Sequence, residues 1–214
     1  MSFFDSLPKP PPPEPRRHER PAWARPEAAI PGSVPLEFVL VRTGQVAVAI
    51  GSVRAYANGF EFTVQIRLRE PADDFGHDPF SRPGRGQSGP DDVLRLGVQY
   101  ADGRRAATTS PHPQVRDQDD DQLRLMHRGG GGSARGFDQQ FWLYPLPPAG
   151  PVTFVVSWLR YGVSEVTAEI DGATIRAAAD RAIALWPEQS EDESRGHWNS
   201  QVISAPAPDK AREK

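Results

Sequence analysis

Residues 73–78 combine one imidazole, that of His77, with the carboxylates of Asp73, Asp74 and Asp78. Imidazole and carboxylate groups are the ligands of facial-triad metal sites, which combine two histidines with one carboxylate. No second histidine lies at a compatible local spacing, and Asp, Gly, His and Pro are also ordinary loop residues. The pattern therefore favours a polar loop, and we predict no metal and no cofactor.

A second acidic run, residues 117–121, has carboxylates at the first, third and fifth positions of a calcium-binding loop. Such a loop needs Gly at its sixth position and Glu at its twelfth, where this chain has Gln122 and Arg128. Because both discriminating positions differ, we expect a solvated acidic loop.

The glycine run 129–132, followed by Ser133 and Gly136, has the composition of a phosphate-binding loop. A P-loop needs Lys and then Ser or Thr after its last glycine, because the ammonium group must reach the phosphates. Here Phe137 and Asp138 follow Gly136. We therefore interpret the glycine run as a flexible spacer.

Nucleophilic and acid–base catalysis find little support. The chain has no cysteine and no Gly-x-Ser-x-Gly elbow, which removes thiol nucleophiles, thiolate zinc sites and one serine hydrolase geometry. On a strand, Glu165 and Glu169 would lie about 13 Å apart, beyond the reach of paired carboxylates, whereas Glu169 and Asp171 would lie about 6.6 Å apart, within the inverting range. Because Asp171-Gly172 is also typical of a plain turn, a glycoside-type hydrolase is only our third hypothesis, and we predict that the protein is not an enzyme.

Net charge and hydropathy argue against nucleic-acid-binding, membrane and secreted proteins. The net charge of -3 supplies no field that would hold a polyanion. No stretch approaches the roughly 18 apolar residues of a membrane helix, and residues 1–7 lack the basic and apolar regions of a secretory signal. We predict no nucleic-acid or membrane partner and a cytoplasmic location.

Proline divides the chain into a tail and a core. Ten of the 23 prolines fall before residue 36, where a fixed φ and a missing N–H donor oppose regular ladders. Residues 1–35 are predicted to be a Pro-rich disordered tail, and residues 188–214 a disordered polar tail. Residues 36–187 remain as one domain, long enough for a single core.

Alternation of apolar and polar residues dominates this domain and predicts strands with one dry and one wet face. In residues 60–68 the apolar positions are Phe60, Phe62, Val64, Ile66 and Leu68. Similar patterns precede Asn58-Gly59, Asp102-Gly103 and Asp171-Gly172, dipeptides that favour hairpin turns, the first of type I′. Gly51-Ser52 is a candidate bulge.

Residues 137–146 and 152–159 are apolar on both sides, which indicates strands covered by a second layer. Residues 176–186 change to three- and four-residue spacing and predict a short helix that ends before Pro187. The fold class is therefore all-β: an antiparallel two-layer β-sandwich, immunoglobulin-like or jelly-roll-like, with one short C-terminal helix.

Trp142 and Tyr144 share one parity of their strand, opposite to the neighbouring phenylalanines, so one set must face away from the main core. If exposed, the two rings would form a stacking platform for a sugar or an apolar side chain. We expect instead that they are covered, by Trp186 and the helix. The long loop 70–91, with Asp73, His77 and Arg82, is the other candidate edge of a binding site.

The Pro-rich start, the entry Pro35-Leu36-Glu37 and the ending 169–172, through residues 177–179 to Leu185-Trp186-Pro187, resemble a group of uncharacterised proteins from GC-rich bacteria. The resemblance covers most of residues 36–187. Its motifs are structural, so it implies no activity and no catalytic residue.

These patterns together favour a non-catalytic β-sandwich module that binds another protein or assembles with itself. The alternative is a small-ligand or carbohydrate-binding domain that uses Trp142, Tyr144 and the loop 70–91. A flat apolar patch would favour the first hypothesis, and a pocket with convergent polar groups the second.

Overall fold

The computed structural model describes residues 17–18, 21–72, 78–80, 89–108, 122–186 and 191–192. The chain divides into two units. In the unit formed by residues 1–20 and 189–214, the described strands β1 (Arg17–His18) and β14 (Glu191–Asp192) pair antiparallel. The rest of both predicted tails lies outside the described residues, apart from residues 21–35. The other unit spans residues 21–188.

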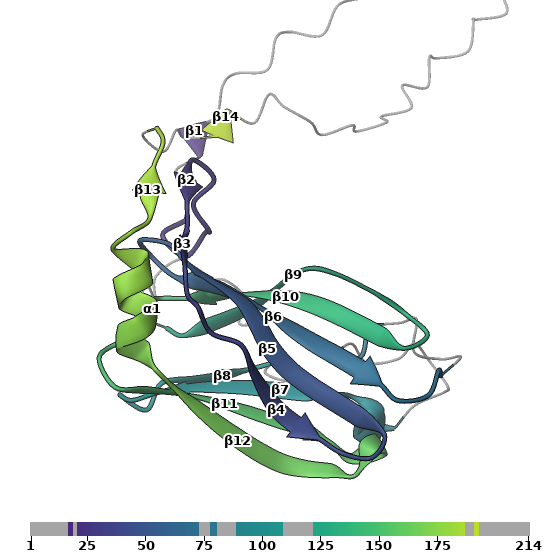
Figure 1. Cartoon of the computed structure of the whole chain (residues 1–214). Helices are drawn as coiled ribbons and strands as arrows, with labels where there is room; N and C mark the ends of the chain where they lie inside the picture. The colour runs from purple at the N-terminus through teal and green to yellow at the C-terminus, as the bar shows by residue number, and fades with distance from the viewer. Residues whose placement is uncertain are drawn as a thin grey trace, which may run out of the picture. The chain divides into compact units, whose positions relative to one another are not determined.

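Two antiparallel sheets pack face to face in this unit (Figure 1). The larger sheet has the order β3-β5-β6-β10-β9, with β4 also paired to β5, and the smaller has the order β12-β11-β7-β8. The strands of the larger sheet are β3 (Gly32–Ser33), β4 (Phe38–Arg42), β5 (Val46–Ala55), β6 (Phe60–Leu68), β9 (Arg124–Ser133) and β10 (Gly136–Tyr144). Those of the smaller sheet are β7 (Arg95–Tyr100), β8 (Arg105–Ala107), β11 (Pro151–Trp158) and β12 (Val163–Asp171). The prediction of an all-β antiparallel sandwich with one helix is confirmed.

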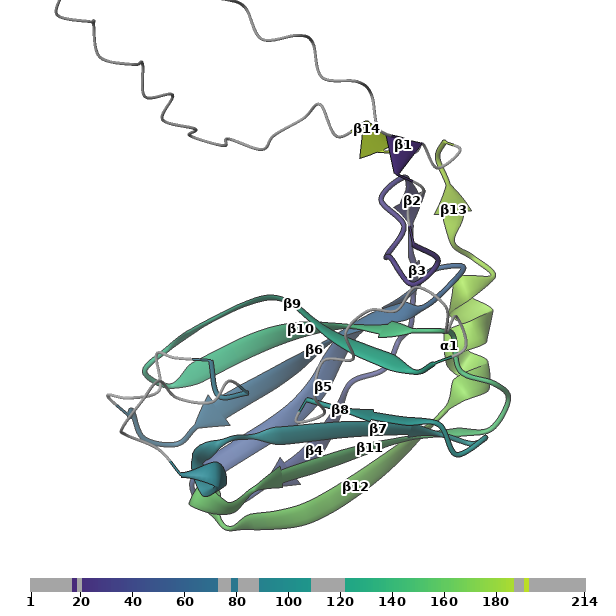
Figure 2. The ribbon, with the colours of Figure 1, turned by 180° about the vertical axis from the view of Figure 1, so that it is seen from behind.

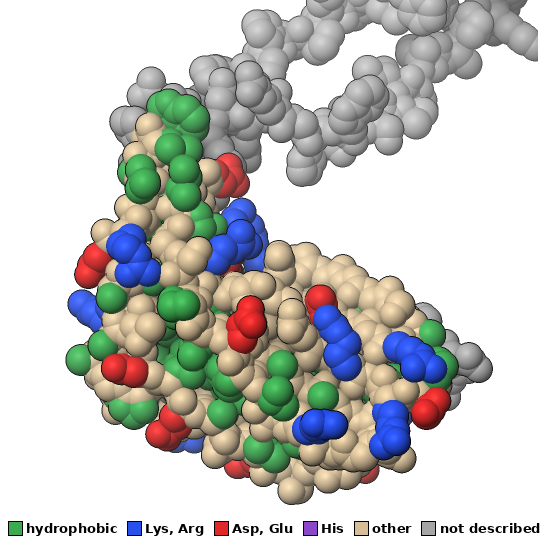
Figure 3. All heavy atoms as spheres, in the orientation of Figure 1, with side chains coloured by type: hydrophobic (Ala, Val, Ile, Leu, Met, Phe, Trp, Pro, Cys, Tyr) green, Lys and Arg blue, Asp and Glu red, His purple; other side chains and the backbone are tan. Residues whose placement is uncertain are grey.

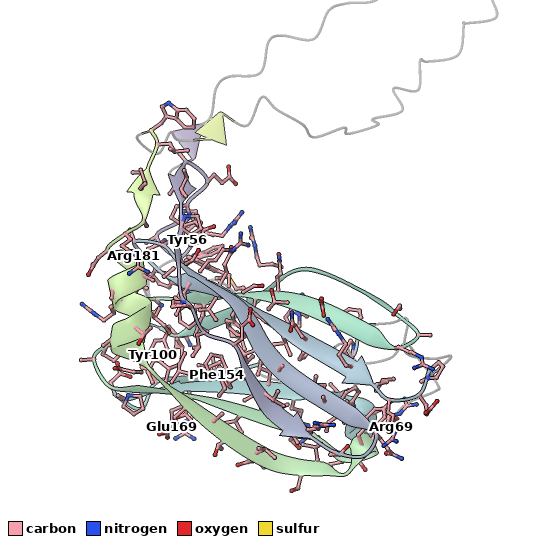
Figure 4. The ribbon with its side chains drawn as sticks, viewed as in Figure 1. Tyr56, Arg69, Tyr100, Phe154, Glu169 and Arg181 are labelled. Atoms are coloured by element: carbon pink, nitrogen blue, oxygen red, sulfur yellow. The ribbon has the colours of Figure 1, made fainter. Side chains whose placement is uncertain are left out.

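The core lies between the two sheets and is rich in aromatic rings. Phe62 of β6 stacks on Phe141 of β10, with ring centroids 5.6 Å apart, and meets the edge of Phe154 from the other sheet at 5.2 Å. Figure 4 shows Phe154 between the sheets. Such contacts add about 0.5–1.5 kcal/mol each to the stabilisation from burial alone. The alternation in residues 60–68 thus supplies the dry face of the larger sheet, as predicted.

The β5–β6 hairpin forms, but its turn is not of the predicted type. Neither Asn58 nor Gly59 has the positive φ that a type I′ turn requires. Gly59 is needed for a different reason, because a Cβ atom there would lie 2.5 Å from the Leu143 carbonyl oxygen and 2.6 Å from the Trp142 ring. The predicted bulge in β5 is confirmed by the register shift after Gly51 and by the left-handed φ of Ser52, 52°.

The glycine run 129–132 is not a flexible spacer but the outer half of β9, paired with β10. The side-chain amide of Gln139 lies across this strand and donates to the carbonyls of Arg128 and Gly129. A Cβ atom at Gly130 would lie 2.3 Å from the Gln139 Oε1 atom. Glycine therefore leaves room for a neighbouring side chain.

The helix begins and ends earlier than predicted. Helix α1 (Gly172–Ala179) follows β12 directly, so Asp171-Gly172 is a helix start and not a hairpin turn. The Asp171 carboxylate caps it by accepting from the Ala173 N–H at 2.9 Å. After the helix, β13 (Ile183–Ala184) pairs with β2 (Ala29–Ile30) in a separate two-stranded ribbon. The predicted helical spacing of residues 176–186 is thus divided between a helix and a strand.

Residues 21–35 belong to this unit, although proline content predicts a tail. Ser33 and Gly32 pair with β5, and Gly32 fits so closely against α1 that a Cβ atom would lie 1.8 Å from the Ala178 carbonyl oxygen. The two 3₁₀ turns, η2 (Pro90–Asp92) and η3 (Leu159–Tyr161), complete the described elements. No helix in the described part of the chain is long and apolar enough to cross a membrane.

Asp171→Ala is expected to lower the free energy of unfolding by about 1 kcal/mol, because it leaves an orphan N–H at the start of α1. Asp171→Asn keeps an N-cap acceptor and should match the unaltered chain within a few tenths of a kcal/mol. Urea unfolding measures both variants. Equal losses in the two variants would contradict a capping role.

Candidate functional site

Two of the predicted binding residues lie on the outer face of the larger sheet. Trp142 and Tyr144 point away from the Phe141 side of β10, as their parity predicts, and are 1% and 8% exposed. They therefore form no open stacking platform. The other three predicted residues, Asp73, His77 and Arg82, lie outside the described residues.

A row of residues in register crosses four strands on this outer face. Arg54 of β5 is opposite Glu61 of β6, Glu61 is opposite Trp142 of β10, and Trp142 is opposite Met126 of β9. Sequence alternation places Glu61 on a wet face. It is nevertheless only 5% exposed, because another segment of the chain covers it.

The cover is residues 21–28, which we call the strap. The indole N–H of Trp142 donates to the Trp23 carbonyl at 2.8 Å. The side-chain amide of Asn58 donates to the carbonyls of Ala22 and Ala24, both at 2.8 Å. The predicted cover by Trp186 and the helix is wrong, since Trp186 is 66% exposed.

Glu61 is the centre of a charged cluster beneath the strap. Its carboxylate lies 2.6 Å from Arg54 Nη2 and accepts from Arg25 Nη1 at 3.2 Å. The Tyr56 hydroxyl accepts from Arg25 at 3.0 Å and donates weakly to Glu61 at 3.4 Å. A buried carboxylate is tolerable only with such partners. Both arginine side chains are partly exposed, so water weakens each ion pair.

The aromatic part of the face packs around this cluster. Tyr56 meets Trp142 edge to face, with ring centroids 5.6 Å apart, and Arg124 lies over the Trp23 ring at 5.6 Å. Figure 4 labels Tyr56 at the end of the sandwich from which the β2–β13 ribbon extends. Burial, followed by the charge of Glu61, raises the pKa of Tyr56, and the two arginines of the cluster oppose this shift.

An open pocket of about 640 Å³ lies beside the cluster. Its lining contains hydroxyl, amide, carboxylate and guanidinium groups above a few apolar residues. The polar lining residues are Ser33, Glu37, Ser52, Arg54, Thr63 and Gln140. Ser52 is the only described non-glycine residue with a positive φ, a conformation that costs free energy and is common at binding sites. The pocket offers hydrogen bonds to a small polar molecule.

A second surface feature is apolar and projects from the sandwich. β2 and β13 extend away from the two sheets in both views (Figures 1 and 2). Four large apolar side chains on and beside these strands are exposed, and we call them the apolar ribbon: Ile30, Ile183, Leu185 and Trp186. Figure 3 shows hydrophobic side chains gathered on this projection.

The residues considered for hydrolysis have structural explanations. Asp171 caps α1, and Glu169 accepts from the Thr153 hydroxyl at 3.1 Å on an exposed face. His127 contacts the rings of Phe80 and Phe141, as expected for a structural histidine. Within the described ranges, no three Asp, Glu or His side chains come together in a way that could hold a metal ion.

No family model matches the chain, and searches of curated proteins and of solved structures found no match. The resemblance to the group from GC-rich bacteria stays a prediction. The residues that sequence analysis missed are Arg25, Asn58 and Glu61. The available signal was Trp23 inside the Pro-rich segment, because disordered segments contain few aromatic residues.

In Tyr56→Phe, the free energy of unfolding is expected to fall less steeply with rising pH than in the unaltered chain. The folded-state pKa of Tyr56 is raised above the ordinary value near 10, so its contribution is complete below about pH 10 and is lost as the pH rises through the folded pKa. One such proton changes the slope by at most about 1.4 kcal/mol per pH unit. Urea unfolding from pH 7 to pH 11 measures the slope.

Asn58→Ala serves as the control for this series, because it weakens the strap without removing a titrating group. Its stability should be lower than that of the unaltered chain by a constant amount over the whole pH range. If the free energy of unfolding of Tyr56→Phe and that of the unaltered chain change in parallel with pH, the assigned pKa shift is contradicted.

Proposed function

We propose that the protein is a non-catalytic β-sandwich module that binds another protein, or a second copy of itself, through the apolar ribbon. The observation that carries this proposal is the exposure of Ile183, 57%, on a projecting two-stranded element and of Trp186, 66%, just after it. Large exposed apolar groups that lie together mark interaction sites more often than isolated ones do. Tryptophan is also among the residues that dominate binding energies.

The ribbon is ordered at its base, which supports a binding role. Arg181 donates to the carbonyls of Ala177 and Ser33, and the Leu185 N–H donates to the Ala28 carbonyl. A two-stranded ribbon by itself is marginally stable in water. Fixing its base before a partner arrives reduces the entropy lost on binding.

Charge favours a protein partner over a nucleic acid. The chain has a net charge of -3, and Arg54 and Arg67 are paired with carboxylates of the larger sheet. Binding a polyanion depends on basic side chains that neutralise phosphates. An apolar surface on a partner protein is the better match to the ribbon.

The double variant Ile183→Ser/Trp186→Ser is expected to weaken association about tenfold or more, because it removes the two most exposed side chains of the ribbon. Sedimentation of the purified chain measures self-association, and cross-linking in host extract followed by mass spectrometry measures association with another protein. Far-ultraviolet circular dichroism verifies that the sandwich remains folded.

The matched control is Val39→Ser, which changes an equally exposed apolar residue of β4, 60% exposed, outside the ribbon. It should leave association unchanged. If the ribbon double variant associates as well as the control, the proposed binding surface is refuted.

A second candidate function is binding of a small polar molecule in the 640 Å³ pocket. The strained Ser52 beside the Arg54 guanidinium favours it, because converging polar groups give orientation and specificity. This site is not the stacking platform predicted from the sequence, since Trp142 and Tyr144 lie beneath the strap.

Filling the pocket tests this candidate. In a thermal-shift screen of sugars and small polar metabolites, any compound that stabilises the chain through this pocket should lose its effect in Gln140→Trp. Gln99→Trp, on an exposed position of the smaller sheet, should retain it. A shift that survives Gln140→Trp, or a screen without any shift, rejects the pocket as the site.

A further inference from the structure

We propose that the outer face around Tyr56, Glu61, Trp142 and Tyr144 is a peptide-binding groove. Its ligand is the Trp23-x-Arg25 segment, which the chain's own strap supplies in the isolated molecule and which a second copy supplies when two chains exchange segments. This inference does not depend on the apolar ribbon as a partner-binding surface.

The strap is held in the way that a bound peptide is held. Three successive carbonyls, those of Ala22, Trp23 and Ala24, accept hydrogen bonds from the side chains of Asn58, in the β5–β6 turn, and Trp142, on β10. A strand would instead exchange backbone bonds with its neighbour. Recognition of carbonyls by side-chain donors suits a proline-flanked segment, which has fewer N–H groups to offer.

Side-chain recognition gives the groove its specificity. The Trp23 side chain packs with the aromatic cluster of Tyr56, Trp142 and Tyr144 and lies under the Arg124 guanidinium. Two residues later, Arg25 reaches both the Glu61 carboxylate and the Tyr56 hydroxyl. The groove therefore recognises an aromatic and a basic side chain that are two residues apart.

The groove is built from strands that do not depend on the strap. Glu61 and Trp142 are in register on β6 and β10, inside a ladder of successive residue pairs. Arg54 lies 2.6 Å from Glu61 and keeps this carboxylate paired when Arg25 leaves. A preformed site loses less entropy when a ligand enters it.

A second copy is the proposed source of the ligand, because its segment can make both the groove contacts and the pairing of β2 with β13. The strap runs directly into β2, which pairs with β13 through Ile30 and Ala29. Gly32, two residues after β2, is fixed against α1, so residues 21–30 form the unit that can leave. The same unit from another chain restores the groove contacts and the ribbon ladder together, which is the condition for segment exchange.

The strap is also imperfectly satisfied in its own groove. The indole N–H of Trp23 is buried without a hydrogen-bond partner, which costs free energy relative to water. An exchanged strap would carry the same unpaired N–H in the partner's groove, so this cost weakens the binding of the strap equally in both arrangements.

Two full-length variants test the exchange. The acceptor, Trp23→Ala/Arg25→Ala, keeps the groove and loses the ligand side chains. The donor, Glu61→Arg, keeps the strap and reverses the charge of the groove. Sedimentation of an equimolar mixture should show a one-to-one complex that binds at least about tenfold more tightly than either variant binds itself. An acceptor that also carries Glu61→Arg should form no complex.

A synthetic peptide of residues 21–30, labelled with a fluorophore, provides a measurement that does not require the donor to fold. It should bind the acceptor at least about tenfold more tightly than the unaltered chain, whose own strap competes. A peptide with alanine at positions 23 and 25 should not bind. Arg25→Ala alone is a milder acceptor if the double variant does not fold.

The outcomes are separable. Failure of the peptide to bind a folded acceptor overturns the groove. Binding of the peptide without a complex of donor and acceptor overturns the second copy as its source and leaves a foreign segment of the same chemistry. Val39→Ser, on the exposed part of β4 outside both the groove and the ribbon, should leave peptide binding unchanged. Ile183→Ser should weaken it, because the peptide includes the β2 strand that pairs with Ile183.

Discussion

The register between β6 and β10 is the constraint on which both faces of the larger sheet depend. It places Phe62 opposite Phe141 on the inner face and Glu61 opposite Trp142 on the outer face. A slip of one residue would send the carboxylate into the core and the rings into the strap, so both faces oppose it. Few strands carry this double constraint, because one face of an antiparallel sheet is usually open to water.

Burial of the outer face requires a cover, and the chain provides one that contains little regular structure. Proline at positions 21 and 26 prevents a continuous ladder. Side-chain donors from Asn58 and Trp142 satisfy the carbonyls instead. The cost of burying Glu61 is offset by Arg25 and Arg54, so the strap both depends on the cluster and completes it.

The described surface is divided between features that suit different ligands. The apolar ribbon suits a protein surface, the pocket beside Arg54 suits a small polar molecule, and the face beneath the strap suits a peptide. The described carboxylates considered for catalysis, Glu169 and Asp171, serve a side-chain hydrogen bond and a helix cap.

The sequence by itself determined the strands and the separation of their faces, because alternation is a local property that each strand carries alone. The bulge at Ser52 and the parity of Trp142 were predictable for the same reason. Tertiary structure decided what covers each face, since Trp23 and Trp142 are 119 residues apart in the sequence. It also decided that Gly130 lies in a strand, because the Gln139 side chain that occupies the space beside it comes from another strand. The helix start at Asp171 is different, because its cap is a local contact with Ala173 that the hairpin interpretation of Asp171-Gly172 overlooked.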